Sequence, residues 1–124
     1  NKLESRASII EELNNPFKFI SKFDLFVLTS KYEGLPNVLL ESLALKTPII
    51  STDCPTGPRE ILGNGKFGTL FRVNDYIALS KLILKFYKNK NFFLKKAKIG
   101  IKSLEKYNYN KNCMKYYKLI KSLN

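Results

Sequence analysis

The sequence predicts an α/β fold in which a parallel sheet is flanked by helices. Three short apolar runs of strand length, at residues 24–30, 47–52 and 67–73, are separated by segments with helical spacing. The first two runs do not alternate between apolar and polar residues, which is typical of strands buried on both faces of a parallel sheet. The order strand, helix, strand, short helix, strand indicates βαβ units.

The composition is that of a globular domain. The chain has 124 residues, of which 44% are hydrophobic, with nine Phe and seven Tyr, and this excludes a disordered tail. No apolar run approaches the length of a membrane span, and no segment has the layout of a signal peptide. The sequence begins at Asn1 without a methionine, so we expect one domain that forms part of a longer protein.

The cysteines and the missing histidine exclude several kinds of site. Cys54 and Cys113 lie far apart and match no metal-binding spacing, and two unpaired cysteines suit a reducing cytoplasm. The chain has no histidine, which removes the commonest general base and metal ligand. The cysteines therefore predict a cytoplasmic protein.

The first elements are expected as follows. Residues 3–13 predict a polar helix, which Pro16 interrupts because a proline disfavours helix at the residue before it. Residues 17–23 predict a short helix, and the strand at 24–30 follows. Residues 36–46, "PNVLLESLALK", predict a longer helix, because proline suits a first helical turn and the apolar residues recur at helical spacing.

The second strand, at 47–52, leads into residues 57–65, which predict one or two helical turns closed by a Gly-Asn-Gly turn. From Asp75, a plausible N-cap, the chain is expected to be entirely helical. The first of these helices has an apolar stripe at Tyr76, Leu79, Ile83, Phe86 and Tyr87. A turn at 89–91 leads to a second helix with Phe93, Ala97, Ile101 and Leu104 inward and Lys95, Lys98 and Lys102 outward. "YNYN" ends it, and the last helix, at 110–122, places Lys111, Lys115 and Lys118 on one side.

The net charge of +12 is unevenly distributed. Residues 1–74 hold nine Lys or Arg against eight Asp or Glu. Residues 75–124 hold thirteen Lys against only Asp75 and Glu105. The C-terminal helices therefore carry a cationic surface, whereas the rest of the chain is electrically ordinary.

The connection from the first strand to the following helix predicts an anion site. The strand ends near Ser30, and the chain turns through Gly34 into a helix that begins near Pro36. Such a turn lies at the carboxyl edge of the sheet, where open α/β folds bind ligands. The first helical amides have no intrahelical partner and carry the positive end of the helix dipole, which suits a phosphate or diphosphate; they belong to Asn37, Val38 and Leu39.

Two carboxylates flank this anion site. Glu33 precedes the turn and Glu41 lies one helical turn beyond its start, while Gly34 lets a ligand approach the backbone because it has no Cβ. A carboxylate can accept two hydroxyl hydrogens at once, so a vicinal diol is its natural partner. An anion site with a diol acceptor on each side describes a nucleotide sugar, with ribose, diphosphate and hexose in order.

The motif "EGLPNVLLE" resembles that of a known family. In the GT-B-fold retaining glycosyltransferases of the large group 1 family, two glutamates are separated by seven residues, as Glu33 and Glu41 are here. The flanking segments "FDLFVLTSKYEG", "ESLALKTPIISTDCPTGPREIL" and "GTLF" are also similar to that family. The resemblance implies the Rossmann-like C-terminal, donor-binding half-domain, with an α/β core at 15–75 and basic C-terminal helices at 75–124.

The resemblance also implies roles for individual residues. Glu33 is the residue expected to take part in catalysis, by accepting hydrogen bonds from the donor hexose, and Glu41 is expected to hold the ribose. The backbone from Gly34 through Leu35 and Pro36 to Asn37 would line the sugar, and that of Val38 and Leu39 the diphosphate. Ser30 is a further candidate contact. Such enzymes retain anomeric configuration and typically use no metal, so the resemblance implies a protein without a metal or other cofactor. The flanking motifs favour a UDP-sugar as donor.

The family's remaining catalytic parts lie outside this sequence. An Arg and a Lys from earlier strands, and an N-terminal acceptor domain of the same chain, would complete the enzyme, so this part is expected to be inactive alone. The expected acceptor is a polysaccharide, a lipopolysaccharide or a lipid-linked oligosaccharide. The basic surface then suggests a peripheral position on the anionic cytoplasmic face of the inner membrane. The alternative is a non-catalytic basic α/β module that binds anionic partners; no motif supports nucleic acid.

Overall fold

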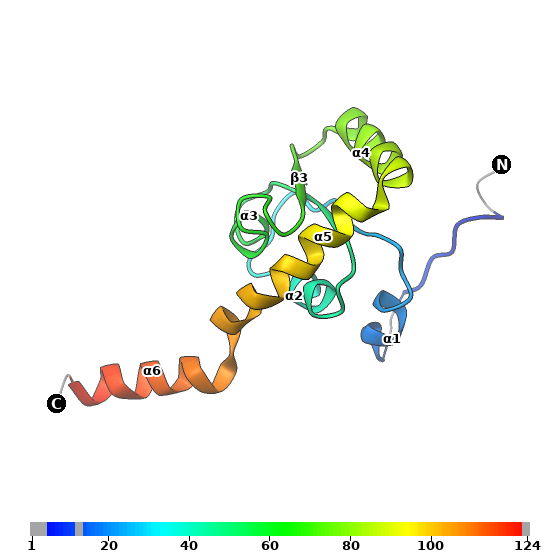
Figure 1. Ribbon diagram of the computed structural model, residues 1–124. Coiled ribbons are helices and arrows are strands. Elements are labelled where there is room, and N and C mark those ends of the chain that lie inside the picture. The colour runs from blue at the N-terminus through cyan, green and yellow to red at the C-terminus, as the bar shows by residue number, and fades with distance from the viewer. Residues whose placement is uncertain (1–4, 12–13, 123–124) are drawn as a thin grey trace.

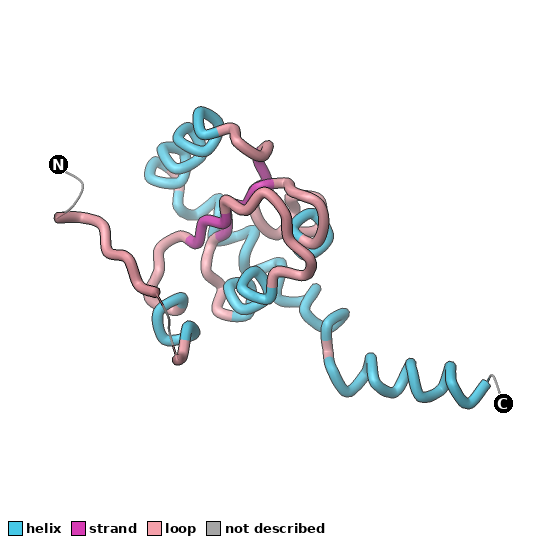
Figure 2. Tube along the Cα trace, turned by 180° about the vertical axis from the view of Figure 1, so that it is seen from behind, coloured by secondary structure: helices cyan, strands magenta, loops and turns pink. Residues whose placement is uncertain are grey.

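A computed structural model describes residues 5–11 and 14–122 of the chain. At its centre is a parallel sheet with the strand order β1 (Phe26–Leu28), β2 (Ile49–Thr52) and β3 (Thr69–Phe71). Val27 lies opposite Ile50 in the register of β1 with β2, and Ser51 lies opposite Leu70 in that of β2 with β3. The predicted α/β fold with a parallel sheet is confirmed (Figure 2).

One helix precedes the first strand, and helices follow each of the three strands, in the predicted order. They are α1 (Pro16–Ile20), α2 (Asn37–Ala44), α3 (Pro58–Ile61), α4 (Tyr76–Lys88), α5 (Lys90–Gly100), the 3₁₀ helix η1 (Ile101–Tyr107) and α6 (Tyr109–Ser122). Figure 1 shows α5 crossing the body of the molecule between α4 and α2. None of the helices in the described residues is long and apolar enough to cross a membrane.

The sheet buries both of its faces under helices. On one face, Ile49 packs with Leu39 and Leu43 of α2 and with Ile61 and Leu62 at α3, all of them at most 1% exposed. On the other face, Ile50 packs with a second cluster that contains Phe71 of β3, Phe86 of α4 and Phe93 of α5. Successive residues of β2 thus point to opposite faces, and the absence of polar alternation in this strand follows from helices on both sides.

Two expectations for the N-terminal part are wrong or only partly right. Residues 5–11 form a turn and irregular backbone, where the sequence predicted part of a helix over 3–13; residues 3, 4, 12 and 13 lie outside the described residues. β1 is half-buried along its whole length rather than fully buried. Among the described residues, β1 is an edge strand that pairs with β2 alone, so one side of it lacks the cover that β2 receives.

In α4 the structure confirms the predicted N-cap and part of the predicted buried face. The carboxylate of Asp75 accepts a hydrogen bond of 2.8 Å from the Ala78 amide, as expected of an N-cap. Tyr76, Ile83 and Tyr87 of the predicted stripe are 77%, 42% and 80% exposed. Leu79 and Phe86 of the predicted stripe do pack on the sheet, where Ala78 and Leu82 join them. Because this helix is apolar over most of its circumference, its periodicity did not determine which face contacts the sheet.

The C-terminal helices end in one that leaves the body of the molecule. The turn expected at 89–91 is a single residue, Asn89, whose side chain accepts from the Phe92 amide and caps α5. The break expected at 107–110 occurs at Asn108. α6 extends away from the sheet and has no buried residue, and its Lys111, Lys115 and Lys118 are all exposed (Figure 1).

Candidate functional site

The candidate site lies at the carboxyl edge of the sheet, where β1 and β2 both end. The loop after β1 leads to α2, and the loop after β2 leads to α3, so the two loops leave the same edge side by side. The side chain of Thr52, at the end of β2, donates a hydrogen bond of 2.7 Å to the carbonyl of Ser30. This bond joins the ends of β1 and β2 three residues before Glu33.

A pair of backbone hydrogen bonds then joins the loops themselves. The Glu33 amide donates to the Pro55 carbonyl at 3.1 Å, and the Thr56 amide donates to the Glu33 carbonyl at 2.8 Å. The Thr56 hydroxyl adds longer contacts of 3.3 and 3.4 Å to the carbonyls of Glu33 and Gly34. Both backbone polar groups of Glu33 are therefore bound by the loop that follows β2.

Gly57 makes this approach of the loops possible. Its φ is 90°, in the region that residues with a side chain rarely adopt. A Cβ at this position would overlap the Gly34 carbonyl oxygen and would lie 2.7 Å from Cδ of Pro36. The two loops are thus as close as their backbones allow.

The start of α2 differs in one respect from the sequence prediction. Pro36 is extended and forms the N-cap, and its carbonyl accepts a hydrogen bond of 2.9 Å from the Leu39 amide. The expectation that Leu39 offers a free amide is therefore wrong, because a tight first turn uses it, while the side chain of Leu39 is fully buried. The amides of Asn37 and Val38 donate to no other group within residues 5–11 and 14–122.

The two carboxylates are placed around this helix start. Glu33 is half-buried in the loop before α2, and Glu41 is half-buried four residues, or one turn, after Asn37. Neither carboxylate forms an ion pair or a hydrogen bond with another side chain in the part of the chain that the structure describes. Both therefore retain their capacity to accept hydrogen bonds from a ligand, and Gly34 and Leu35 between them are exposed.

The same described residues hold no group of three carboxylate, thiolate or imidazole side chains close enough to bind a metal ion. Ser30, the further candidate contact, is half-buried beside the loop, and its carbonyl is the acceptor for Thr52.

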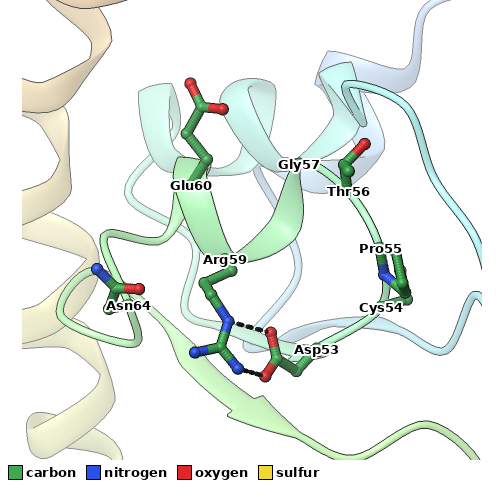
Figure 3. A pocket seen from close by; sticks show the side chains of 8 residues that line it. All are labelled: Asp53, Cys54, Pro55, Thr56, Gly57, Arg59, Glu60 and Asn64. Carbon is green, nitrogen blue, oxygen red and sulfur yellow. Dashed lines mark hydrogen bonds and ion pairs between the residues drawn. The ribbon is translucent and has the colours of Figure 1, made fainter.

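A cavity of about 580 Å³ opens beside this helix start, and sequence reasoning did not assign it to the site. Residues of the β2–α3 connection, of α3 and of the turn after α3 line it: Asp53, Cys54, Pro55, Thr56, Gly57, Arg59, Glu60 and Asn64 (Figure 3). Asp53 and Arg59 form a two-bond ion pair, with Nε of Arg59 2.9 Å from Oδ1 of Asp53. Cys54 is 3% exposed and lies among the buried residues at this edge.

Glu60 points away from the Asp53–Arg59 pair and serves a structural contact (Figure 3). Nζ of Lys106, in η1, lies 2.7 Å from its Oε1, and the Tyr107 hydroxyl lies 3.4 Å from the same oxygen. The hydrogen bond from Lys106 holds the pKa of Glu60 below its ordinary value, and the same bond raises the pKa of Lys106. Arg59 and Glu60 both lie in α3, so the short helix predicted within residues 57–65 is confirmed.

Comparisons with known proteins place this geometry in context. The profile of the family described as "Glycosyl transferases group 1" matches residues 2–112. The N-acetylgalactosamine-N,N'-diacetylbacillosaminyl-diphospho-undecaprenol 4-alpha-N-acetylgalactosaminyltransferase of Campylobacter jejuni is 32% identical over 117 residues, 92% of this chain. A lipopolysaccharide 1,6-galactosyltransferase of Escherichia coli is 37% identical over 67 residues, 54% of this chain. The crystal structure of TarM aligns with 86% of the chain at a TM-score of 0.73 and 28% identity.

The chain covers only a minor part of each of these proteins. It spans 32% of the Campylobacter jejuni relative, 19% of the Escherichia coli relative and 22% of the TarM chain. The likeness therefore describes one region of proteins that are several times longer.

Proposed function

The chain belongs to the glycosyl transferases group 1 family, and from this premise we propose that it is the nucleotide-sugar-binding region of a retaining GT-B glycosyltransferase. The observation that carries the proposal is the arrangement at the start of α2. Two half-buried carboxylates, Glu33 and Glu41, lie on either side of the amides of Asn37 and Val38, and within residues 5–11 and 14–122 none of these four groups has a hydrogen-bond partner. This order matches a nucleotide sugar: Glu33 would accept hydrogen bonds from the hexose, the two amides would donate to the diphosphate, and Glu41 would accept from the ribose.

Each group then has a defined part in binding. Glu41 accepts hydrogen bonds from the ribose hydroxyls, and the amides of Asn37 and Val38 bind the diphosphate with the positive end of the helix dipole. Glu33 accepts hydrogen bonds from the hexose, whose ring lies along the exposed backbone of Gly34 and Leu35. As the bond to the diphosphate breaks, negative charge grows on the leaving group, and the same amides stabilise it without a metal ion.

The complete protein is proposed to supply the rest of the enzyme. Because the relatives are several times longer than this chain, we place the acceptor site and the basic groups that face the diphosphate in a preceding domain of the same protein. The names of the relatives favour a diphospho-undecaprenol-linked oligosaccharide or a lipopolysaccharide as acceptor. A UDP-sugar is the favoured donor.

Two measurements on the complete protein test this function. Calorimetry should detect binding of UDP, and incubation with UDP-linked hexoses should release UDP and transfer the sugar with retained anomeric configuration, read by NMR of the product. A protein that binds no nucleotide and releases none from any donor would overturn the proposal.

A specific observation also favours a binding role for the basic half of the chain. Residues 75–124 contain thirteen lysines and two acids, and Lys95, Lys98, Lys102, Lys115 and Lys118 are exposed. Other lysines are engaged in contacts: Lys90 with Asp24, Lys106 with Glu60 and Lys111 with Glu105. The exposed group would hold the protein at the anionic cytoplasmic face of the inner membrane, near a lipid-linked acceptor. Without catalysis, the same surface would make the chain a basic module for anionic partners.

A further inference from the structure

We propose that Gly57 is a positioning residue for Glu33, and that the β2–α3 loop thereby controls recognition of the donor hexose. The inference rests on the proposed function, since it assigns the donor sugar to Glu33. It gives a role to the segment "TDCPTGPREIL", which the nucleotide-sugar site itself does not use.

The backbone that carries Glu33 depends on this neighbouring loop. In the described part of the chain, the backbone of Glu33 and Gly34 forms hydrogen bonds only with Pro55 and Thr56. The flanking residues provide little other support, because Tyr32 is 81% exposed and Leu35 is 50% exposed. The position of the Glu33 carboxylate is therefore set largely by the β2–α3 loop, which holds Pro55 and Thr56.

The β2–α3 loop is the better anchored of the two. The carbonyl of Gly57 accepts a hydrogen bond of 2.9 Å from the Ile61 amide, which fixes the glycine to the first turn of α3. Pro58, Ile61 and Leu62, which follow it, are buried in the core. The loop thus acts as a fixed support against which the Glu33 segment is held.

Gly57 sets the distance between the support and the Glu33 segment. Any side chain there would displace Gly34 or Pro36, because a Cβ would overlap the Gly34 carbonyl oxygen. A displacement of this kind moves the residue next to Glu33 while α2 stays anchored by Leu39 and Leu43, both fully buried. The hexose end of the site is then altered, whereas Glu41, on α2, keeps its place.

The test compares Gly57→Ala with Gly65→Ala in the complete protein. Gly65 is a matched control, because its φ of 87° is close to the 90° of Gly57 but its Cβ would meet nothing nearer than 3.9 Å. Both variants place an alanine at a positive φ of nearly the same value, and only Gly57→Ala adds the overlap with Gly34. UDP binding is measured by calorimetry, and donor turnover by release of nucleotide from UDP-linked and GDP-linked hexoses.

We expect Gly57→Ala to lower kcat/KM for the preferred donor at least thirtyfold while the Kd for UDP changes less than fivefold. Gly65→Ala should change both by less than threefold. In a Glu33→Gln background, Gly57→Ala should lower turnover by less than a further threefold, because it acts through Glu33. Should Gly57→Ala fail to fold, Thr56→Val replaces it in the test. We expect Thr56→Val to lower kcat/KM for the preferred donor threefold to tenfold and Thr56→Ser to restore it.

The outcomes separate the inference from the function on which it rests. Suppose that the wild-type protein turns over a donor, but the losses from Gly57→Ala and Glu33→Gln multiply in the double variant. This result overturns the positioning role of Gly57 and leaves the proposed function standing. Equal losses in Gly57→Ala and Gly65→Ala overturn it in the same way. A wild-type protein that neither binds UDP nor releases nucleotide from any donor overturns the function, and the inference with it.

Discussion

The hydroxyl of Thr52 donates a hydrogen bond of 2.7 Å to the carbonyl of Ser30, and this bond ties the end of β2 to the end of β1. Thr52 is 1% exposed, so a valine in its place would leave the Ser30 carbonyl without this donor in a largely dry environment. We expect Thr52→Val to lower the local free energy of unfolding by about 1–2 kcal/mol. Native-state hydrogen exchange of peptides from residues 26–52 would measure the loss. Thr29→Val, at an exposed position of the same connection, should have no comparable effect.

Lys96 provides a second structural test. Its ammonium group donates to the carbonyls of Gly65 and Gly68 at 2.8 and 3.1 Å and lies 3.4 Å from the Thr69 hydroxyl. It thereby joins α5 to the turn before β3. Lys96→Met would leave both carbonyls without this donor, and we expect a loss of about 1–2 kcal/mol in unfolding free energy. Lys95→Met, at the exposed neighbouring position, is the control.

The pH dependence of this loss has a definite sign. Burial, with a smaller contribution from the charge of Lys85, lowers the pKa of Lys96 in the folded chain. The unfolded chain therefore binds more protons between that pKa and the ordinary value of about 10.4, so Lys96 makes stability rise with pH in this window. The free energy of unfolding of the wild type, relative to that of Lys96→Met, should increase as the pH rises toward the ordinary lysine pKa of about 10.4. A difference that falls or stays constant in urea unfolding would contradict this.

Much of the fold could be predicted because its signals are local. The apolar runs at 24–30 and 47–52, the proline at 36 and the acid at 75 each act on the nearest few residues, and each element formed where it was expected. The start of α2 followed from the same reasoning, and only the tightness of its first turn, which uses the Leu39 amide, was missed.

What could not be predicted depends on contacts between distant segments. The predicted buried face of α4 is right for Leu79 and Phe86 but wrong for Tyr76, Ile83 and Tyr87, because the sheet selects one side of a broadly apolar helix. The half-burial of β1 follows from its edge position, which strand order alone determines. Lys96 was counted with the cationic surface of the C-terminal helices, since nothing near it in sequence shows that the carbonyls of Gly65 and Gly68 accept hydrogen bonds from it. Gly57 lies inside a motif that is visible in the sequence, yet the role proposed for it depends on the position of Gly34 in the fold.

The exposed lysines predict electrostatic binding to anionic membranes. Each lysine near such a surface contributes roughly 1 kcal/mol, and the attraction decays within a Debye length of about 8 Å at physiological ionic strength. Sedimentation of the complete protein with anionic vesicles should fall steeply with added salt and should be absent with neutral vesicles. Replacement of Lys95, Lys98 and Lys102 by glutamine should weaken it without unfolding the helices, because glutamine is a comparable helix former.

A charge-matched variant controls for this experiment. Replacement of the exposed Lys18, Lys22 and Lys66 by glutamine removes the same charge from outside the C-terminal helices and should have less effect on sedimentation. Equal sedimentation of the wild type with neutral and anionic vesicles at low salt would mean that the lysines form only a solvated surface.

Glu33→Gln should separate sugar recognition from nucleotide binding. Glutamine has nearly the same shape, but it lacks the charge that strengthens hydrogen bonds from the hexose hydroxyls. We expect the Kd for UDP to be retained while turnover falls and discrimination between epimeric donors weakens. The measurement is kcat/KM for a panel of UDP-linked hexoses, and normal turnover of the preferred donor would remove Glu33 from the site.

The most direct test of the donor site is the affinity of the complete protein for UDP when Glu41 is replaced. Glu41→Ala removes charge-assisted hydrogen bonds to the ribose, which should cost about 1.5–3 kcal/mol, or a tenfold to roughly hundredfold rise in Kd. Calorimetry of wild type, Glu41→Ala and the control Glu105→Ala, an exposed acid of η1, makes the comparison. We predict weakened binding in Glu41→Ala alone. UDP and GDP affinities that remain unchanged in Glu41→Ala would contradict the assignment of the nucleotide to the start of α2.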